Sequence, residues 1–289
     1  MNDIRRVAVI GAGTMGHGIA QVAALAGWDV TLTDALTAAL GPARDRIRQN
    51  LDGGVSRGKV TAQAAAAAMT RISLATTVED AVAAADLVIE AVVEDLPVKR
   101  ALFADVASAA PSAATLATNT SSLSVARIAE AVPDPGRVVG MHFFNPVHVM
   151  KLVEVVTHDA SHGTHVDRVV RAARAMGKEP IVVRDAPGFA SSRLGVVLGL
   201  EAMRMVEQGV ASAADIDKAM ELGYGHPMGP LKVTDLVGLD VRLAIAEYLH
   251  RELGGAHYAP PDLLRAKVRA GELGKKTGRG FYEWPTTPS

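Results

Sequence analysis

The stretch that decides the fold is VAVIGAGTMGHGIA, residues 7–20. A short apolar run leads into Gly11, Gly13 and Gly16, and a helical pattern follows. This G-x-G-x-x-G spacing between a strand and a helix is typical of a dinucleotide-binding turn. Gly11 permits the tight turn, Gly13 lets a pyrophosphate approach the backbone, and Gly16 allows the helix to pack closely on the strand. The sequence therefore predicts a nucleotide site here.

A carboxylate follows the second predicted strand, DVTLTD at residues 29–34. Asp34 lies roughly 20 residues after the glycines, where an acidic side chain accepts hydrogen bonds from the adenosine ribose. Ala35 follows it, in place of an Arg that would balance a 2′-phosphate. We therefore expect NAD rather than NADP, bound also through Thr14 and Met15 at the helix N-terminus. FAD or another nucleotide stays open, and so does a simple helix-capping role for Asp34.

Length and composition set the broad class. The 289 residues suit two domains, and 49% hydrophobic with 21% charged residues permits a large core. A net charge of −1 argues against a dedicated nucleic-acid surface. The chain has no cysteine, which excludes disulfides, thiolate-bound zinc and thiol catalysis. Its first residues show no signal-peptide pattern, and charges interrupt the apolar run at residues 81–93, so we expect a cytoplasmic protein without a membrane span.

Strand and helix patterns alternate over residues 1–186, which predicts an α/β Rossmann-type domain with a mainly parallel sheet. A helical insert is expected at about 35–69, interrupted near Gly53, Gly54 and Gly58. Residues 187–289 are predicted to form an all-α domain for substrate binding and dimerisation. Its four expected helices cover residues 190–208, 213–222, 235–253 and 261–271, and the next strand pattern is GFYEW at 280–284.

Two ionisable residues interrupt apolar, strand-like segments. His142 ends the predicted strand RVVGMH, and Glu154 lies inside KLVEVV. A buried carboxylate is costly unless it is paired, and an imidazolium is its natural partner. Histidine also titrates in the range suited to taking a proton from an alcohol. Asn119 and Ser121 follow another strand end. Singly, each residue has a structural explanation, but together beside a dinucleotide turn they favour a catalytic site.

The segment HDASHGTH at residues 158–165 contains three histidines and an aspartate. It lies in a loop rich in small and polar residues just before a predicted helix. We interpret it as solvated surface and expect no metal site.

Motifs along the chain carry a family resemblance. GAGTMGHGIA, TNTSSLSV, MHFFNPVHVMKLVEVV, APGF, GHPMGPL, DLVGLD and GKKTGRGFY occur in this order. The chain resembles the L-3-hydroxyacyl-CoA dehydrogenases, and in size the short 3-hydroxybutyryl-CoA dehydrogenases. The resemblance implies reversible, NAD-dependent oxidation of (S)-3-hydroxyacyl-CoA, with an acyl-CoA as small-molecule partner. It also implies a homodimer through the C-terminal helices, which carry apolar stripes.

The resemblance implies roles for individual residues. His142 would be the general base, Glu154 its charge partner, and Ser121 a hydrogen-bond donor to the substrate oxygen. Many relatives carry an Asn near the substrate carbonyl where this chain has Ser192, whose hydroxyl has a shorter reach. The cofactor contacts implied, besides the glycine turn and Asp34, are Glu94, Lys99, Asn119, Ser121, Asn145 and Lys276.

The segment IRQNLDGGVSRGKV, residues 47–60, matches the family's helical insert that contacts coenzyme A. Asn50, Arg57 and Lys59 are the candidate contacts, and the planar fork of Arg suits phosphate. An ordinary solvated basic face is the alternative explanation.

Two other functions stay open. L-gulonate 3-dehydrogenases share the glycine turn and a helical second domain, and a non-catalytic NAD-binding homologue would share the fold. The basic insert favours a coenzyme A thioester over a sugar acid. The set Ser121, His142 and Glu154 favours an enzyme, because a silent protein has no physical need for a buried ionic pair.

Overall fold

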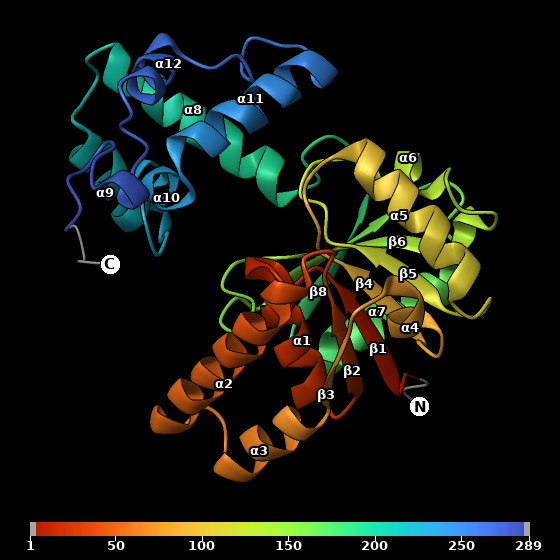
Figure 1. Cartoon of the computed structure of the whole chain (residues 1–289). Coiled ribbons are helices and arrows are strands. Elements are labelled where there is room, and N and C mark those ends of the chain that lie inside the picture. Colours follow the sequence, from red (N-terminus) through yellow and green to blue (C-terminus); the bar gives the residue numbers. More distant parts are fainter. Residues whose placement is uncertain (1–3, 286–289) are drawn as a thin grey trace. The chain divides into compact units, whose positions relative to one another are not determined.

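The computed structural model describes residues 4–285, which form two compact units (Figure 1). The first unit extends to Ala186 and the second begins at Pro187. Each unit has its own hydrophobic core, one built around Val9, Ile19 and Leu32 and the other around Leu200, Met203 and Leu249.

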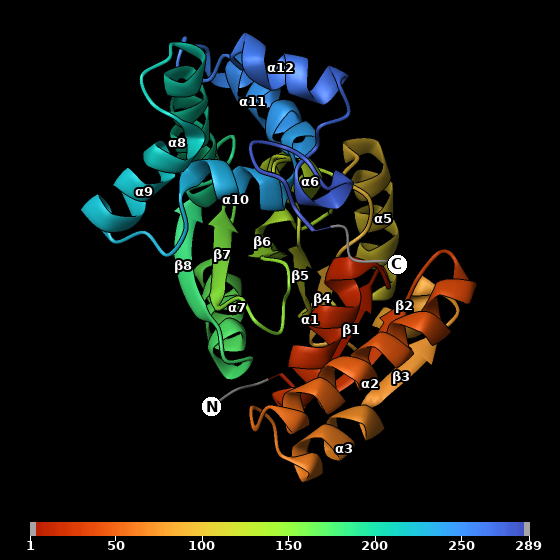
Figure 2. The same cartoon turned by 90° about the vertical axis from the view of Figure 1, so that its left-hand side faces the viewer.

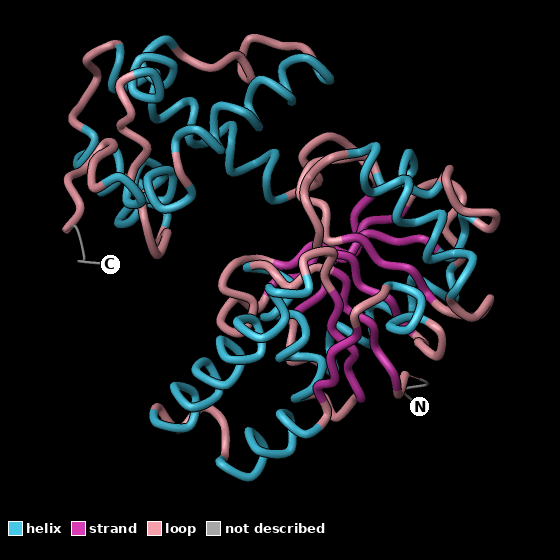
Figure 3. Tube along the Cα trace, in the orientation of Figure 1, coloured by secondary structure: helices cyan, strands magenta, loops and turns pink. Residues whose placement is uncertain are grey.

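The first unit is an eight-stranded sheet with the order β3-β2-β1-β4-β5-β6-β7-β8. Figure 3 draws its strands in magenta. All neighbouring strands pair in parallel except β6 and β7, which are antiparallel. The first six positions have the order of a doubly wound nucleotide-binding sheet, so the predicted Rossmann-type fold is confirmed. The strands are β1 (Arg6–Ile10), β2 (Asp29–Thr33), β3 (Ile72–Ala75), β4 (Leu87–Glu90), β5 (Thr115–Thr118), β6 (Val138–Phe143), β7 (Leu152–Thr157) and β8 (Glu179–Arg184).

Helices cover both faces of this sheet, which is why β4, β5 and β6 are buried at every position (Figures 1 and 2). One face packs against α1 (Thr14–Leu25) and α7 (Gly163–Ala175), and α2 (Leu40–Ser56) and α3 (Ala62–Thr70) pack on α1. The other packs against α4 (Val78–Val82), α5 (Leu96–Ala109) and α6 (Val125–Ala129). Single 3-10 turns precede α2 and β6, namely η1 (Thr37–Ala39) and η2 (Pro135–Arg137).

The helical insert differs from the prediction in its point of interruption. Gly53 and Gly54 lie inside α2, and the break comes after Ser56. Gly58 adopts φ +64°, a conformation that ends helices, whereas a glycine inside a helix costs only about 1 kcal/mol and is tolerated. Thr61 then caps α3 by accepting a hydrogen bond from the Ala64 N–H at 3.1 Å.

The second unit is all-α, as predicted, but its described residues form five helices rather than four. They are α8 (Ser191–Glu207), α9 (Ala213–Tyr224), α10 (Pro230–Val237), α11 (Leu239–Leu253) and α12 (Asp262–Arg269), followed by the 3-10 turn η3 (Lys275–Thr277). The stretch predicted as one helix over 235–253 is divided at Gly238, which has φ +103°. None of the helices described for residues 4–285 has the length and apolar character needed to cross a bilayer.

The GFYEW segment is not a strand, so that prediction is wrong. It forms only isolated bridges, such as that between Arg279 and Glu283. The buried Asp235 carboxylate holds the segment by accepting hydrogen bonds from the Phe281 and Tyr282 N–H groups and from the Trp284 indole, all at 2.8–2.9 Å. Side-chain hydrogen bonds therefore replace a sheet ladder.

The glycine turn gives a testable packing prediction. A Cβ at Gly16 would lie 1.6 Å from the Gly11 carbonyl oxygen, whereas a Cβ at Gly41 in α2 meets no atom within 4 Å. We expect Gly16→Ala to lower the free energy of unfolding of the first unit by about 2–4 kcal/mol, because backbone must shift. Gly41→Ala is the matched control, and its free energy of unfolding should not fall. Urea unfolding followed by circular dichroism measures both, and equal stability would contradict this packing role.

Candidate active site

Polar side chains gather at one edge of the sheet in the first unit. The chain leaves β1 at the Gly11 turn, β2 at Asp34, β4 at Glu90, β5 at Asn119, and β6 just after His142. These five strands are parallel, so their carboxyl ends share one edge. Ligands of open α/β sheets bind at this edge.

His142 and Glu154 face each other directly across β6 and β7. They are register partners in the antiparallel pair, and Nδ1 of His142 lies 2.8 Å from Oε2 of Glu154. His142 is 5% exposed and Glu154 is fully buried. The Phe144 ring lies 4.5 Å from the imidazole, centroid to centroid. A hydrogen bond to a carboxylate in this setting fixes the orientation of the ring.

The glycine turn has room for a dinucleotide. A Cβ at Gly13 would meet no atom within 4 Å, so the backbone is open to a close approach. No side chain caps the start of α1, where Thr14 is exposed and Met15 is half-buried. The first N–H groups of α1 can therefore bind phosphate. These features fit NAD.

Asp34 closes the turn from the neighbouring strand end. Its Oδ2 accepts a hydrogen bond from the Ala12 N–H at 2.7 Å, and its Oδ1 accepts one from the Leu36 N–H at 2.8 Å. Each carboxylate oxygen has two lone-pair directions, so one acceptor position remains on each for a ribose hydroxyl. Asp34 thus shapes the turn and offers acceptors to an adenosine ribose.

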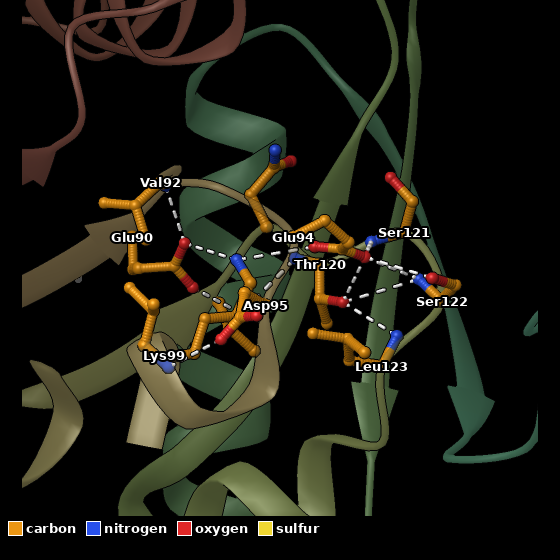
Figure 4. A network of polar contacts seen from close by, with 12 residues as sticks. Glu90, Val92, Glu94, Asp95, Lys99, Thr120, Ser121, Ser122 and Leu123 are labelled. Carbon is orange, nitrogen blue, oxygen red and sulfur yellow. Dashed lines mark hydrogen bonds and ion pairs between the residues drawn. The ribbon is translucent and has the colours of Figure 1, made fainter. Parts of the chain in front are cut away.

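A second buried ion pair lies between β4 and α5 (Figure 4). Lys99 and Glu90 are each 1% exposed, and Nζ of Lys99 lies 2.5 Å from Oε1 of Glu90. Glu90 also accepts hydrogen bonds from the Val92 N–H at 2.7 Å and the Thr118 hydroxyl at 2.6 Å. Lys99 is therefore enclosed by protein carboxylates, and its predicted contact with the cofactor stays a prediction.

Glu94 ties the loop after β5 to this ion pair (Figure 4). Its Oε1 accepts hydrogen bonds from the Thr120 hydroxyl at 2.7 Å and the Ser121 N–H at 2.8 Å, and its Oε2 lies 3.5 Å from Nζ of Lys99. Burial alone would raise the pKa of Glu94, but the charge of Lys99 and these hydrogen bonds outweigh it and lower the pKa. Glu94 is thus a fixed anion that orders the loop containing Ser121.

The remaining predicted residues of the first unit lie around the same strand ends. The Asn119 side chain accepts a hydrogen bond from the Phe143 N–H at 2.8 Å and so joins β5 to the end of β6. Ser121 is exposed, and its hydroxyl makes no hydrogen bond within residues 4–285. Asn145 is exposed just beyond β6, in a cis peptide bond to Pro146.

Two predicted residues belong to the second unit. Lys276 forms an ion pair with Asp240, with Nζ 2.6 Å from Oδ1. Ser192 lies in the first turn of α8. The predicted cofactor contact of Lys276 and the predicted substrate contact of Ser192 therefore stay predictions.

Sequence reasoning missed the residues that support this site. Glu90, Thr118 and Thr120 form hydrogen bonds that were not predicted. The available signal was Glu90, a carboxylate in the apolar run DLVIEAV. A charge in a fully buried strand requires a partner, and the argument that predicted a partner for Glu154 applies equally to Glu90.

The predicted coenzyme A residues line a cavity of about 660 Å³ next to α1 and α2. Arg57 and the half-buried His148 lie in its wall, and Lys178 Nζ donates hydrogen bonds to the Val147 and Met150 carbonyls. Burial, and next the charges of Lys178 and Arg57, lower the pKa of His148. Described residues that line the cavity include no Asp or Glu; the polar ones are Gln21, Asn50, Arg57, Lys59, His148, Lys151 and Lys178.

The histidine-rich loop has other contacts. His158 Nε2 lies 3.0 Å from the Val138 carbonyl, His162 lies 3.2 Å from Asp134, and His165 lies 2.7 Å from the Thr115 hydroxyl. Within residues 4–285 no cluster of three or more His, Cys, Asp or Glu residues is arranged to hold a metal.

The chain is similar in sequence to known proteins over nearly its whole length. Residues 6–186 match the family model for the NAD-binding domain of 3-hydroxyacyl-CoA dehydrogenase, and residues 188–284 match its C-terminal domain. A Bacillus subtilis protein named probable 3-hydroxybutyryl-CoA dehydrogenase is 44% identical, over 98% of each chain. Escherichia coli 3-hydroxyadipyl-CoA dehydrogenase is 44% identical over 98% of this chain and 60% of its own length.

A solved structure agrees with these matches. The crystal structure of (S)-3-hydroxybutyryl-CoA dehydrogenase from Ralstonia eutropha superposes with a TM-score of 0.94 at 38% identity, covering 98% of this chain and 100% of that one. Both family models together span nearly the whole chain. The chain therefore belongs to the 3-hydroxyacyl-CoA dehydrogenase family and is an NAD-dependent oxidoreductase.

Proposed function

We propose that this enzyme oxidises the 3-hydroxyl of an (S)-3-hydroxyacyl-CoA to a ketone, reversibly, with His142 as the general base. The observation that carries the proposal is the buried His142–Glu154 pair, held at the sheet edge where the dinucleotide turn also lies. An acid–base group beside a nicotinamide site is what oxidation of an alcohol requires.

The reaction needs one proton and one hydride to leave the carbinol. Nδ1 of His142 is bound to Glu154, so Nε2 is the nitrogen that accepts the hydroxyl proton. The Glu154 carboxylate then stabilises the imidazolium that forms. NAD, when bound by the glycine turn and Asp34, would supply the acceptor for the hydride that leaves C3. Ser121 donates a hydrogen bond to the substrate oxygen, and Glu94 positions Ser121 by binding its backbone N–H.

We assign cofactor binding to the first unit. The glycine turn binds the pyrophosphate through backbone N–H groups, and Asp34 binds the adenosine ribose. Glu94, Asn119 and Asn145 complete the site near the ends of β4, β5 and β6. Lys99 acts through Glu94, because its ammonium is enclosed by Glu90 and Glu94.

We assign coenzyme A phosphates to the cationic cavity beside α2. Its wall carries Asn50, Arg57 and Lys59, together with the cationic Lys151 and Lys178. Arg57 can bind two phosphate oxygens at once, and the apolar part of the wall suits an adenine ring. Two relatives differ in acyl group by name, one a 3-hydroxybutyryl-CoA and the other a 3-hydroxyadipyl-CoA dehydrogenase. We propose that 3-hydroxybutyryl-CoA is a substrate of this enzyme.

We assign substrate contacts and dimerisation to the second unit. Leu194, Leu222 and Tyr224 are more than 70% exposed there, which is unusual for large apolar side chains. Burial of such a surface against a second copy would stabilise a homodimer. The mass of the protein in solution tests whether it is a dimer. We also propose a cytoplasmic location.

One assay separates the candidate activities. NADH oxidation with acetoacetyl-CoA supports the acyl-CoA function. Turnover of L-gulonate but not acetoacetyl-CoA would favour the sugar-acid enzyme. Binding of NADH without turnover of either would favour a non-catalytic homologue.

His142→Gln should reduce kcat by about 100- to 10,000-fold, because the general base is lost. The Kd for NADH should stay nearly unchanged. His162→Gln is the matched control, since His162 is more than half exposed and pairs with Asp134. Steady-state rates and NADH fluorescence titration measure the two effects. Near-normal turnover of His142→Gln would remove this residue from the mechanism.

Asp34→Asn should raise the Kd for NADH by about tenfold or more, because a charged acceptor of the ribose hydroxyls is lost. The Kd for NADPH should rise less, since the repulsion of its 2′-phosphate is also lost. Asp29→Asn, at the exposed start of the same strand, is the control. Equal effects of Asp34→Asn on both cofactors would mean that the ribose is recognised elsewhere.

Arg57→Ala should raise the KM for acetoacetyl-CoA by about tenfold, because a charge-assisted contact with phosphate is lost. The KM for acetoacetyl-pantetheine, which lacks the nucleotide, should change little. Arg48→Ala removes an exposed cation of α2, the helix that ends just before Arg57, and serves as the control. A similar rise with both thioesters would count against a phosphate contact.

A further inference from the structure

Three cations that line the cavity beside α2 have no anionic partner in the described chain. Arg57, Lys59 and Lys151 form no ion pair and no side-chain hydrogen bond within residues 4–285. Arg48, on another face of α2, does form an ion pair, with Nη1 3.0 Å from Oδ1 of Asp45. The cavity, which lies wholly in the first unit, therefore gathers positive charge that these residues do not neutralise.

The Arg57 guanidinium lies over the last turn of α2. A Cβ at Gly53 would be 3.2 Å from Nη1 and 3.4 Å from Nη2 of Arg57, so the guanidinium packs against bare backbone. Gly54, the next residue, lines the cavity. The planar fork therefore lies at the cavity wall, where it can donate two parallel hydrogen bonds to one phosphate.

His148 lies among these cations, in the loop between β6 and β7. Its ring is half-buried and makes no hydrogen bond within the described residues. The Lys178 ammonium binds the same loop, because it donates hydrogen bonds to the Val147 and Met150 carbonyls. Lysine and arginine ordinarily titrate far above neutral pH, whereas histidine titrates close to it. His148 is thus the cavity residue whose charge is expected to change near pH 7.

The charged and titratable groups around His148 are basic. They are His17 of α1, Arg57 and Lys59 just after α2, Lys151 just before β7, and Lys178 just before β8. Burial lowers the pKa of His148, and the charges of Lys178, Arg57 and His17 lower it further. The imidazole of the protein alone is therefore mostly neutral at pH 7. A phosphate within hydrogen-bond distance would favour the protonated ring, so anion binding and protonation are linked.

The rest of the cavity wall is apolar and suits a planar base. Val22, Leu25 and Ala26 lie there together with Val149 and Met176. Coenzyme A ends in an adenosine whose ribose carries a 3′-phosphate, so a base and a phosphomonoester are neighbours on one sugar. A phosphomonoester carries a charge of about −1.5 to −2 at neutral pH. This end of coenzyme A therefore matches both the apolar and the cationic part of the wall.

We propose that His148 is a specificity-determining residue that binds the 3′-phosphate of coenzyme A and takes up a proton from solvent as this phosphate enters the cavity. This inference rests on the proposed acyl-CoA function and assigns a proton-linked contact within it. The imidazolium donates one hydrogen bond to the phosphate, and the Arg57 fork donates two more. Discrimination between an acyl-CoA and its dephospho form then depends on pH.

The direction of this pH effect follows from the lowered pKa of His148. Below that pKa the ring is already protonated, and its contribution to phosphate binding is greatest. As the pH rises towards the higher pKa of the phosphate-bound ring, binding must draw a proton from solvent and becomes weaker. Above both pKa values the phosphate meets a neutral ring, and the contribution of His148 is smallest.

The test compares acetoacetyl-CoA with acetoacetyl-dephospho-CoA, which lacks only the 3′-phosphate, from about pH 6.5, where this phosphate is mostly a dianion, to about pH 8.5. The ratio of the two KM values cancels the pH dependence of the chemical step. At the lower pH the ratio should favour acetoacetyl-CoA by about tenfold or more, and at the higher pH by about three- to tenfold less.

His148→Gln should remove this pH dependence and keep the smaller ratio at every pH. His162→Gln, whose side chain lies outside the cavity, is the control and should behave like the parent. Tm and the Kd for NADH should stay unchanged in both variants. A parent ratio that is constant with pH, or a pH dependence that persists in His148→Gln, would overturn the proposal.

Calorimetry on the unmodified enzyme measures the proton directly, whether or not the variant folds. Titration with coenzyme A in buffers of different ionisation enthalpy should show uptake of part of a proton near pH 7, and titration with dephospho-coenzyme A should show almost none. Equal proton uptake with both ligands would contradict a link to the 3′-phosphate. If acetoacetyl-CoA is not turned over, the proposed function itself fails, whereas turnover with a pH-independent KM ratio refutes only the role of His148.

Discussion

The antiparallel pairing of β6 with β7 is the contact on which the site depends. It brings Glu154 opposite His142, with 2.8 Å between Oε2 and Nδ1. A parallel neighbour would need a long crossover and would hold its residues in a slanted register. Without this pairing the sheet would bury the Glu154 carboxylate without its imidazole partner, which is destabilising. The same contact therefore stabilises the sheet and fixes the orientation of the imidazole that we propose as the general base.

Buried charge organises the cofactor side of the site in the same way. Glu90 and Lys99 neutralise each other between β4 and α5, and Lys99 also approaches Glu94. Glu94 then collects hydrogen bonds from the loop after β5. Backbone groups of a loop are normally mobile or solvated. Here a carboxylate of lowered pKa fixes them, so the Ser121 backbone is held where a substrate oxygen is expected.

Buried charges in both units have polar partners supplied by the chain, with Arg242 as an exception in the described residues. In the first, Glu90, Glu154 and Lys178 each have polar partners supplied by the chain. In the second, the Arg242 guanidinium is buried beside Gly195 without one in the described residues.

The sequence by itself determined the Rossmann-type sheet, the glycine turn and the position of Asp34 at the end of the second strand. It also determined the membership of the 3-hydroxyacyl-CoA dehydrogenase family. These depend on local spacing and periodicity, which a linear reading preserves. Tertiary structure alone decided that α2 continues through Gly53 and Gly54, that Gly238 divides α10 from α11, and that Asp235 replaces a strand ladder at Phe281. It also decided that Lys99 is enclosed and that Arg242 is unpaired within the described part of the chain. Burial and pairing join residues distant in the chain, so no local pattern encodes them.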